Sequence, residues 1–238
     1  MLIRETQGLQ VLMVQRNHHI DFFSGAMVFP GGKVEPQDAD PGWSRAAVGW
    51  NSTPEEERAP RIAALRETFE ECGVLSAAGL VQIGTDEAQD ARASIEAGRL
   101  SFLDFVRSKG IEPDLTRLTL FARWLTPPIV PKRFDTFFYL IEMPEGQVVL
   151  HDGHETIENE WVAPAAALRL AETGQRTILF PTRMNLRLLS ETPTLKEAVQ
   201  RSGLRKPRQV SPSVEVRDGK RYIRLSRDDG YGDVEEPV

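Results

Sequence analysis

Three glutamates, Glu67, Glu70 and Glu71, have the spacing of neighbours on one side of a helix. Such a cluster is unfavourable near the end of a helix, because like charges repel and the carboxyl end carries partial negative charge. Gly73 is the expected helix stop. A bound divalent cation would remove both penalties, and carboxylate oxygens suit Mg²⁺ or Mn²⁺. A solvated acidic face is the alternative that the spacing leaves open.

A helix over residues 54–72 is needed to position these carboxylates. Ser52 or Thr53 is the expected N-cap, with Pro54 in the first turn. The side opposite the glutamates carries apolar residues at helical spacing, namely Ile62, Leu65, Phe69 and Cys72. We therefore expect the glutamates on a solvent-facing side and Cys72 packed in the core.

A glycine-rich segment precedes this helix. Residues 29–35 read Phe-Pro-Gly-Gly-Lys-Val-Glu, and the glycine pair allows backbone to approach a metal closely. Arg66 and Glu70 are four positions apart on the helix, so Arg66 is placed to orient Glu70.

Together the two segments resemble the Nudix box, Gly-x5-Glu-x7-Arg-Glu-U-x-Glu-Glu-x-Gly-U, in which U is aliphatic. Gly32 begins the match, and residues 66–74 complete it. There are three departures: Asp38 replaces the first glutamate, Thr68 replaces an aliphatic residue, and Asp38 and Arg66 are 28 positions apart where the box has eight, an excess of 20. Extra length between a loop and a helix costs little. The chain thus resembles Nudix hydrolases, and among them the branch with an insertion here, similar to peroxisomal coenzyme A diphosphatases.

The resemblance implies an α/β fold, a Nudix-type α/β/α sandwich with a mixed β-sheet and helical insertions. It also implies an enzyme that hydrolyses a nucleoside diphosphate linked to another moiety, with Mg²⁺ or Mn²⁺ as cofactor. Glu67 and Glu71 are the expected metal ligands, together with the backbone carbonyl of Gly32. Glu70 is a third ligand or the general base, and Arg66 supports it.

Acidic residues later in the chain are further candidates, because a late glutamate acts in parts of the family. Glu158 and Glu160 would share a strand face and are catalytic candidates beside Glu155, with ordinary surface acids as the alternative. The histidines are weaker candidates. His151 and His154 form His-x-x-His, for which a structural zinc site is one alternative. His18 and His19 are either residues at the substrate entrance or ordinary surface loop residues.

A second pattern concerns the substrate. Coenzyme A diphosphatases carry approximately Leu-Leu-Thr-x-Arg, a spacer, then Gly-x3-Phe-Pro-Gly-Gly. Residues 12–16 match its length and its arginine, with two other positions departing, and residues 25–32 match fully. Guanidinium groups bind phosphate through paired hydrogen bonds, so Arg16 and Arg133 are candidate phosphate clamps. For each arginine, a surface or structural salt bridge is the alternative role.

These features leave three hypotheses for the function. The first is a diphosphatase acting on coenzyme A or acyl-coenzyme A. The second is an ADP-ribose or nucleotide-sugar diphosphatase. The third is a non-catalytic nucleotide-sensing Nudix module, which would not need the complete acidic set.

The resemblance implies a small-molecule nucleotide diphosphate as the partner, and the composition agrees with this expectation. The 238 residues carry a formal net charge of −6, which argues against a nucleic-acid or membrane surface. The single cysteine suits a reducing compartment. No apolar run approaches the ~20 residues that span a bilayer, and no signal peptide is recognisable. We therefore expect a cytoplasmic protein.

The expected organisation is a Nudix domain over residues 1–205 and a C-terminal extension over 206–238. Insertions are predicted at about 39–58 and 86–110. The extension reads as a hairpin around Asp218-Gly219 and an acidic tail, with the last ten residues disordered. The charges of the extension indicate charge balance within the chain or a contact in a homodimer, with a phosphate site as the alternative. Strands are predicted at 9–15, 26–29, 118–125, 136–141, 147–150 and 157–162, and further helices at 86–98, 101–109, 164–172, 182–190 and 194–201.

Overall fold

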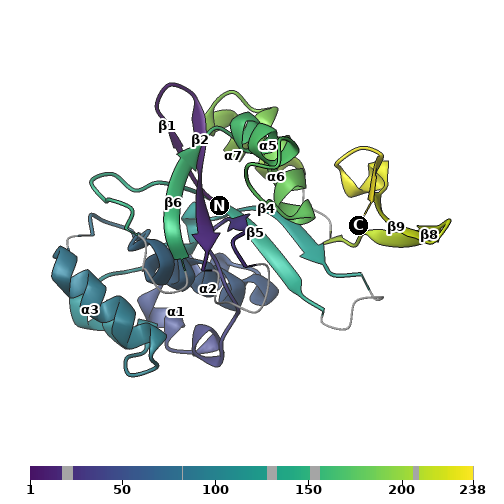
Figure 1. The fold of residues 1–238 in the computed structure, drawn as a ribbon. Helices are drawn as coiled ribbons and strands as arrows, with labels where there is room; N and C mark the ends of the chain where they lie inside the picture. Colours follow the sequence, from purple (N-terminus) through teal and green to yellow (C-terminus); the bar gives the residue numbers. More distant parts are fainter. Residues whose placement is uncertain (18–23, 82, 128–132, 151–155, 206–208, 238) are drawn as a thin grey trace.

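A mixed β-sheet forms the centre of the protein (Figure 1). The computed structural model describes residues 1–17, 24–81, 83–127, 133–150, 156–205 and 209–237. The strands of this sheet are β1 (Leu2–Glu5), β2 (Leu9–Arg16), β3 (Met27–Val28), β4 (Thr119–Leu125), β5 (Asp135–Glu142), β6 (Thr156–Val162) and β7 (Gln209–Val210). The β1–β5 and β4–β7 pairs are parallel, and the pairs β1–β2, β2–β3, β2–β6 and β4–β5 are antiparallel.

Strand β3 pairs with β2 on one side, and its Met27 forms a parallel bridge with Ile178 on the other. Because β6 pairs with one edge of β2 along residues 11–16, β1 and β3 must share the other edge. Beyond the start of β1, the side chain of Phe29 reaches β5 and packs edge-to-face on Phe138, with ring centroids 6.2 Å apart. The glycine loop that follows β3 therefore starts beside β2.

Helices cover both faces of this sheet (Figure 1). Val11 and Met13 of β2 join the core with α5, α6 and α7, whereas Leu12 and Val14 point to the opposite face and join the core with α2. The bounds are α2 (Glu55–Cys72), α5 (Pro164–Glu172), α6 (Phe180–Ser190) and α7 (Leu195–Arg205). This arrangement confirms the predicted α/β class. In the described part of the chain, no helix combines the length and the apolarity needed to cross a bilayer.

Helix α2 is present as predicted, but it begins differently. Its N-cap is Pro54, without a side-chain capping bond, and the Thr53 hydroxyl donates instead to the Gly49 carbonyl at 2.8 Å. The predicted cap by Ser52 or Thr53 is therefore wrong. The helix stops at Gly73, which has a φ of 70°. The predicted apolar stripe is buried, comprising Ile62, Leu65, Phe69 and Cys72.

The two segments predicted as insertions pack against the apolar side of α2. Phe69 of α2 stacks on Phe105 with ring centroids 5.0 Å apart, and Trp43 packs on Phe102 at 5.6 Å. Their helices are α1 (Trp43–Ala46), α3 (Thr85–Glu96) and α4 (Phe102–Lys109). Both segments thus contribute to the core beneath the carboxylates, while their boundaries as insertions stay a prediction.

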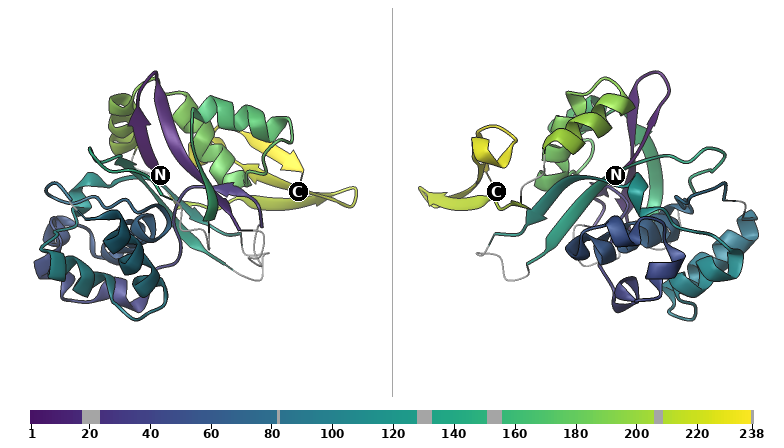
Figure 2. Two further views of the ribbon diagram at one scale, coloured as in Figure 1. Left: turned by 60° about the vertical axis from the view of Figure 1, so that its left-hand side comes forward. Right: turned by 180° about the vertical axis from the view of Figure 1, so that it is seen from behind.

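The C-terminal extension forms a second, three-stranded sheet in the order β10-β9-β8. Its strands are β8 (Ser213–Arg217), β9 (Lys220–Leu225) and β10 (Val234–Pro237). Figure 2 shows its hairpin extending away from the central sheet. The turn at Asp218 and Gly219, with φ of 51° and 74°, is as predicted. The predicted disorder of the tail is wrong, because β10 pairs with β9, and pairs such as Arg224–Glu215 balance charge within the chain.

One predicted strand, over 147–150, does not form. The Gln147 side chain instead accepts from the Leu75 N–H at 2.9 Å and donates to its carbonyl at 2.8 Å. The Leu150 N–H donates to the Cys72 carbonyl at 3.0 Å. This segment therefore closes the carboxyl end of α2. Strands β1 and β7 were not predicted, because each is short and lacks an alternating pattern.

Candidate active site

The Gly31–Gly32 turn lies directly against the carboxylates of α2. The Gly31 N–H donates to Glu71 Oε2 at 3.0 Å. Gly31 has a φ of 148°, which disfavours any side chain, and a Cβ on Gly32 would lie 2.4 Å from both carboxylate oxygens of Glu67. A side chain is therefore disfavoured at Gly31 by the backbone conformation and at Gly32 by the close approach of Glu67. The turn thus places its backbone against Glu67 and Glu71, the two carboxylates predicted from the sequence as metal ligands.

A buried arginine joins this loop to the helix. Arg66 is 1% exposed and donates from Nε and Nη2 to Asp38 at 2.9 and 3.0 Å. It also donates from Nη2 to the Lys33 carbonyl at 2.8 Å. Its Nη1 lies 3.0 Å from Glu67 and 3.2 Å from Glu70. The contact predicted between Arg66 and Glu70 is present, and the long insertion does not prevent Asp38 from meeting Arg66.

The carboxylates of α2 are more buried than predicted. Glu67 is 8% exposed and Glu71 is 4% exposed, so the expected solvent-facing side is wrong. The reason is that the glycine turn and the Asp38 segment cover this side of the helix. The guanidinium of Arg66 contacts three acidic side chains, those of Asp38, Glu67 and Glu70, and the Glu71 carboxylate lies on the same helix against the Gly31 N–H. Buried negative charge in excess of positive charge is unfavourable without a further cation.

The environment of the cluster alters the protonation of Glu70. Burial raises its pKa from 4.5 to about 7; the charge of Arg66 opposes the rise and that of Glu67 adds to it. A carboxyl group with a pKa near neutrality can both accept and release a proton under ordinary conditions.

This raised pKa predicts that the metal-free protein loses stability as the pH rises. A group whose pKa is higher in the folded chain stabilises the fold fully below its unfolded pKa, and that contribution is lost as the pH rises through the folded pKa. The window is therefore from about 4.5 to about 7. Between pH 5 and 8, urea unfolding in EDTA should show wild type losing roughly 2–3 kcal/mol more than Glu70→Gln. An identical pH dependence in both proteins would contradict the shift.

The donor atoms of the cluster suit a hard divalent cation. Among the described residues, no three His, Cys, Asp or Glu side chains are grouped as a ready-made metal site. Mg²⁺ commonly binds through one or two carboxylates, with water and substrate phosphates completing its shell. Glu67, Glu71 and the Gly32 carbonyl would hold such an ion, and the excess buried negative charge fits it.

Glu158 and Glu160 lie on β6, on the other face of the sheet. They are paired with Gln15 and Met13 of β2, and residues directly opposite in an antiparallel pair point to the same face. That face is the one covered by α5–α7, since Met13 lies in its core. Arg176, which no spacing or motif singled out, has its Nη2 3.2 Å from Glu158 and 3.7 Å from Glu160. The fold thus does not bring these two glutamates together with those of α2.

Arg16 and Arg133 lie at the same end of the sheet. Arg16 is the last residue of β2, and Arg133 lies two residues before β5. The Nε of Arg16 is buried and has no hydrogen-bond partner among the described residues. Arg133 is exposed, and its Nε donates to the Thr126 carbonyl at 3.3 Å.

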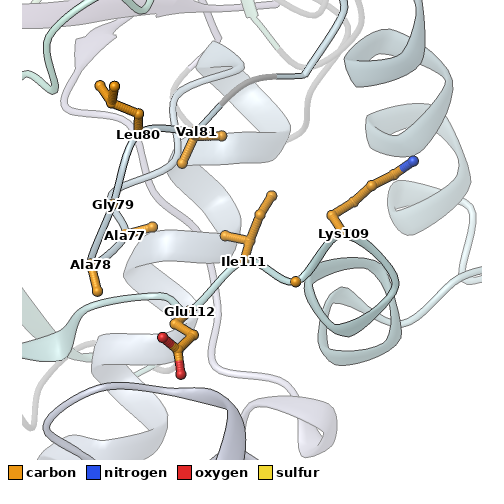
Figure 3. Close-up of a pocket in the computed structure, with 9 residues that line it drawn as sticks. Ala77, Ala78, Gly79, Leu80, Val81, Lys109, Ile111 and Glu112 are labelled. Carbon is orange, nitrogen blue, oxygen red and sulfur yellow. The ribbon is translucent and has the colours of Figure 1, made fainter.

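Two surface hollows are lined by residues outside the carboxylate cluster. The hollow in Figure 3 is formed by residues 77–81 and 109–112, at the end of α4. The other lies at the carboxyl end of α2, where Arg92 of α3 contributes to its lining. Arg92 was not predicted as a functional residue, because an arginine within a polar helix resembles a surface residue. The histidines at 18, 19, 151 and 154 and Glu155 fall outside the described residues.

Comparison with known proteins agrees with this geometry. The family described as NUDT19 Nudix domain matches residues 46–187. Acyl-coenzyme A diphosphatase NUDT19 of Xenopus laevis is 25% identical over 209 residues, covering 68% of this chain and 55% of that protein. The human protein of the same name is 27% identical over 206 residues, with the same coverage. The chain thus spans about half the length of these relatives.

A solved structure extends the comparison to the fold. The crystal structure of a Nudix hydrolase from Alicyclobacillus acidocaldarius has a TM-score of 0.72 to this chain and 30% sequence identity. The similarity covers 84% of this chain and 92% of that one. Since the family match extends over more than half of the sequence and the fold is similar over 84% of it, this chain belongs to the Nudix hydrolase family.

Proposed function

We propose that this protein is a Mg²⁺- or Mn²⁺-dependent diphosphatase that hydrolyses coenzyme A or acyl-coenzyme A. The observation that supports it best is the contact of the Gly31–Gly32 turn with Glu67 and Glu71, fixed by the buried Arg66. The names of the relatives support the substrate class. Because the chain spans about half of the length of these relatives, we assign their activity to this protein as a proposal.

The proposed reaction is the attack of water on a phosphorus atom of the diphosphate. The new phosphorus–oxygen bond forms as the bridging anhydride bond breaks, giving 3′,5′-ADP and a phosphopantetheine, acylated where the substrate is an acyl ester. A bound divalent ion would neutralise non-bridging oxygens and lower the pKa of the attacking water. Glu67, Glu71 and the Gly32 carbonyl would hold that ion.

Glu70 is the proposed base for this step. With a pKa of about 7, its carboxylate can take the proton of the attacking water near neutral pH. Arg66 Nη1, 3.2 Å away, holds that carboxylate in orientation. Arg16 and Arg133 are proposed to bind phosphate groups of the substrate from the end of the sheet. Glu158 and Glu160 remain weaker candidates, since Arg176 already engages both on the other face.

A substrate panel tests this proposal. Coenzyme A, an acyl-coenzyme A, dephospho-coenzyme A and ADP-ribose are incubated with Mg²⁺ or Mn²⁺, and the nucleotide products, 3′,5′-ADP or AMP, are measured by chromatography. We expect the highest kcat/KM for coenzyme A or its acyl ester. Faster hydrolysis of ADP-ribose would favour a nucleotide-sugar diphosphatase. Nucleotide binding without turnover of any substrate would favour a sensing module.

Arg16→Ala tests whether Arg16 binds the 3′-phosphate of coenzyme A. Losing a charged donor to a bound phosphate costs about 1.5–3 kcal/mol, which is roughly a ten- to hundredfold loss of kcat/KM for coenzyme A. Dephospho-coenzyme A, which has no 3′-phosphate, should be affected much less. Equal losses on both substrates would assign Arg16 to the fold or to the diphosphate instead.

A further inference from the structure

The last turn of α2, which carries Glu70 and Glu71, ends against helix α3. Arg92 of α3 is 5% exposed, and its Nε donates to the backbone carbonyl of Glu70 at 2.8 Å. A Cβ on Gly73 would lie 3.4 Å from Arg92 Nη1, so the guanidinium also lies beside the helix stop. A cation from a segment distant in sequence is therefore held at the carboxyl end of α2.

The carbonyls at this end of α2 receive donors from separate parts of the chain. The Gly73 N–H donates to Phe69 at 2.8 Å, and the Leu150 N–H donates to Cys72 at 3.0 Å. These two donors are neutral, whereas Arg92 brings a positive charge. Positive charge is stabilising here, because the carboxyl end of a helix is negative and three glutamates add to that potential. Charge and hydrogen bond both act on the turn that carries the acidic cluster.

We propose that Arg92 is a positioning residue for the active site. It fixes the last turn of α2 and offsets its negative potential, so that the α2 carboxylates keep the arrangement that binds a divalent ion. The proposal rests on the proposed function of these carboxylates. It gives the helical insertion a role in metal binding in addition to the packing of Phe105 on Phe69.

The test uses the full chain with two substitutions of Arg92 and one control. Arg92→Met removes the charge and keeps the length, whereas Arg92→Lys keeps the charge and loses the planar fork. Arg107→Met is the matched control, because Arg107 lies in the same insertion, is exposed, and also donates to a backbone carbonyl, that of Gly42 at 3.0 Å. Mn²⁺ affinity is measured by electron paramagnetic resonance without substrate, beside kcat, KM and the melting temperature.

Arg92→Met should lower both kcat and Mn²⁺ affinity by roughly 10- to 100-fold, as is usual for partners that support metal ligands. The KM for substrate should change little, and Arg92→Lys should recover part of both losses. Arg107→Met should behave as wild type. If Arg92 has a purely structural role, Arg92→Met should lower the melting temperature without the pattern of reduced kcat and nearly unchanged KM.

Several results would overturn the inference. Folded Arg92→Met with wild-type kcat and Mn²⁺ affinity would show that Arg92 only stabilises the fold. If Arg92→Met does not fold, Arg92→Lys decides: reduced kcat and Mn²⁺ affinity support the proposal, and unchanged values contradict it. Wild type that binds Mn²⁺ but hydrolyses no substrate would end the proposed function alone, since the Mn²⁺ affinities of the variants would still test Arg92.

Discussion

Glu71→Gln should reduce turnover by at least ~10²-fold, the largest effect expected of any single carboxylate. Glutamine has the same shape, and its amide oxygen can still accept the Gly31 N–H that now lies 3.0 Å from Glu71. What it loses is the negative charge that would hold a divalent ion between the helix and the turn. The measurement is kcat at saturating substrate with excess Mg²⁺.

The same variant has an expected effect on stability in the opposite direction. Without metal it should be at least as stable as wild type, because repulsion among the α2 glutamates is relieved. Glu55→Gln is the matched control, since Glu55 is exposed at the first turn of the same helix. A near-wild-type rate for Glu71→Gln would remove Glu71 from the proposed ligands. Equal loss in Glu55→Gln would indicate a general sensitivity to charge on α2.

Arg66→Met should destabilise the protein by roughly 3–5 kcal/mol, which is the usual cost of leaving buried partners of an ion pair behind. Arg66 and Asp38 are 1% and 0% exposed at the side chain, and they meet through two hydrogen bonds. The variant would leave Asp38, Glu67 and Glu70 without their shared cation. Urea unfolding in EDTA measures this loss, and activity should fall with it because Glu70 is no longer oriented.

A second arginine provides the comparison. Arg201 faces Glu197 at helical i,i+4 spacing, as Arg66 faces Glu70, but its pair is 57% and 43% exposed and 3.9 Å long. Arg201→Met should change stability by no more than about 1 kcal/mol. If Arg66→Met and Arg201→Met cost the same, the buried network would contribute no more than a surface pair, and another feature would have to hold the loop on α2.

The sequence alone was sufficient for the features set by local geometry. The spacing of Glu67, Glu70 and Glu71 places them on one side of α2 wherever that helix packs, because neighbours on a helix are three and four residues apart. The pairing of Arg66 with Glu70 has the same cause. The buried stripe through Phe69 follows from the apolar period.

Burial, pKa and long-range partners were decided by the tertiary structure. Glu67 and Glu71 are buried because a turn some forty residues earlier in the sequence covers them, and that burial also raises the pKa of Glu70. Arg92 and Arg176 gained their partners in the same way, through α3 packed at the end of α2 and through the register of β6 on β2. Helical and strand periodicity fix which face a side chain occupies within its own element, whereas the segment that covers this face depends on the packing of distant elements.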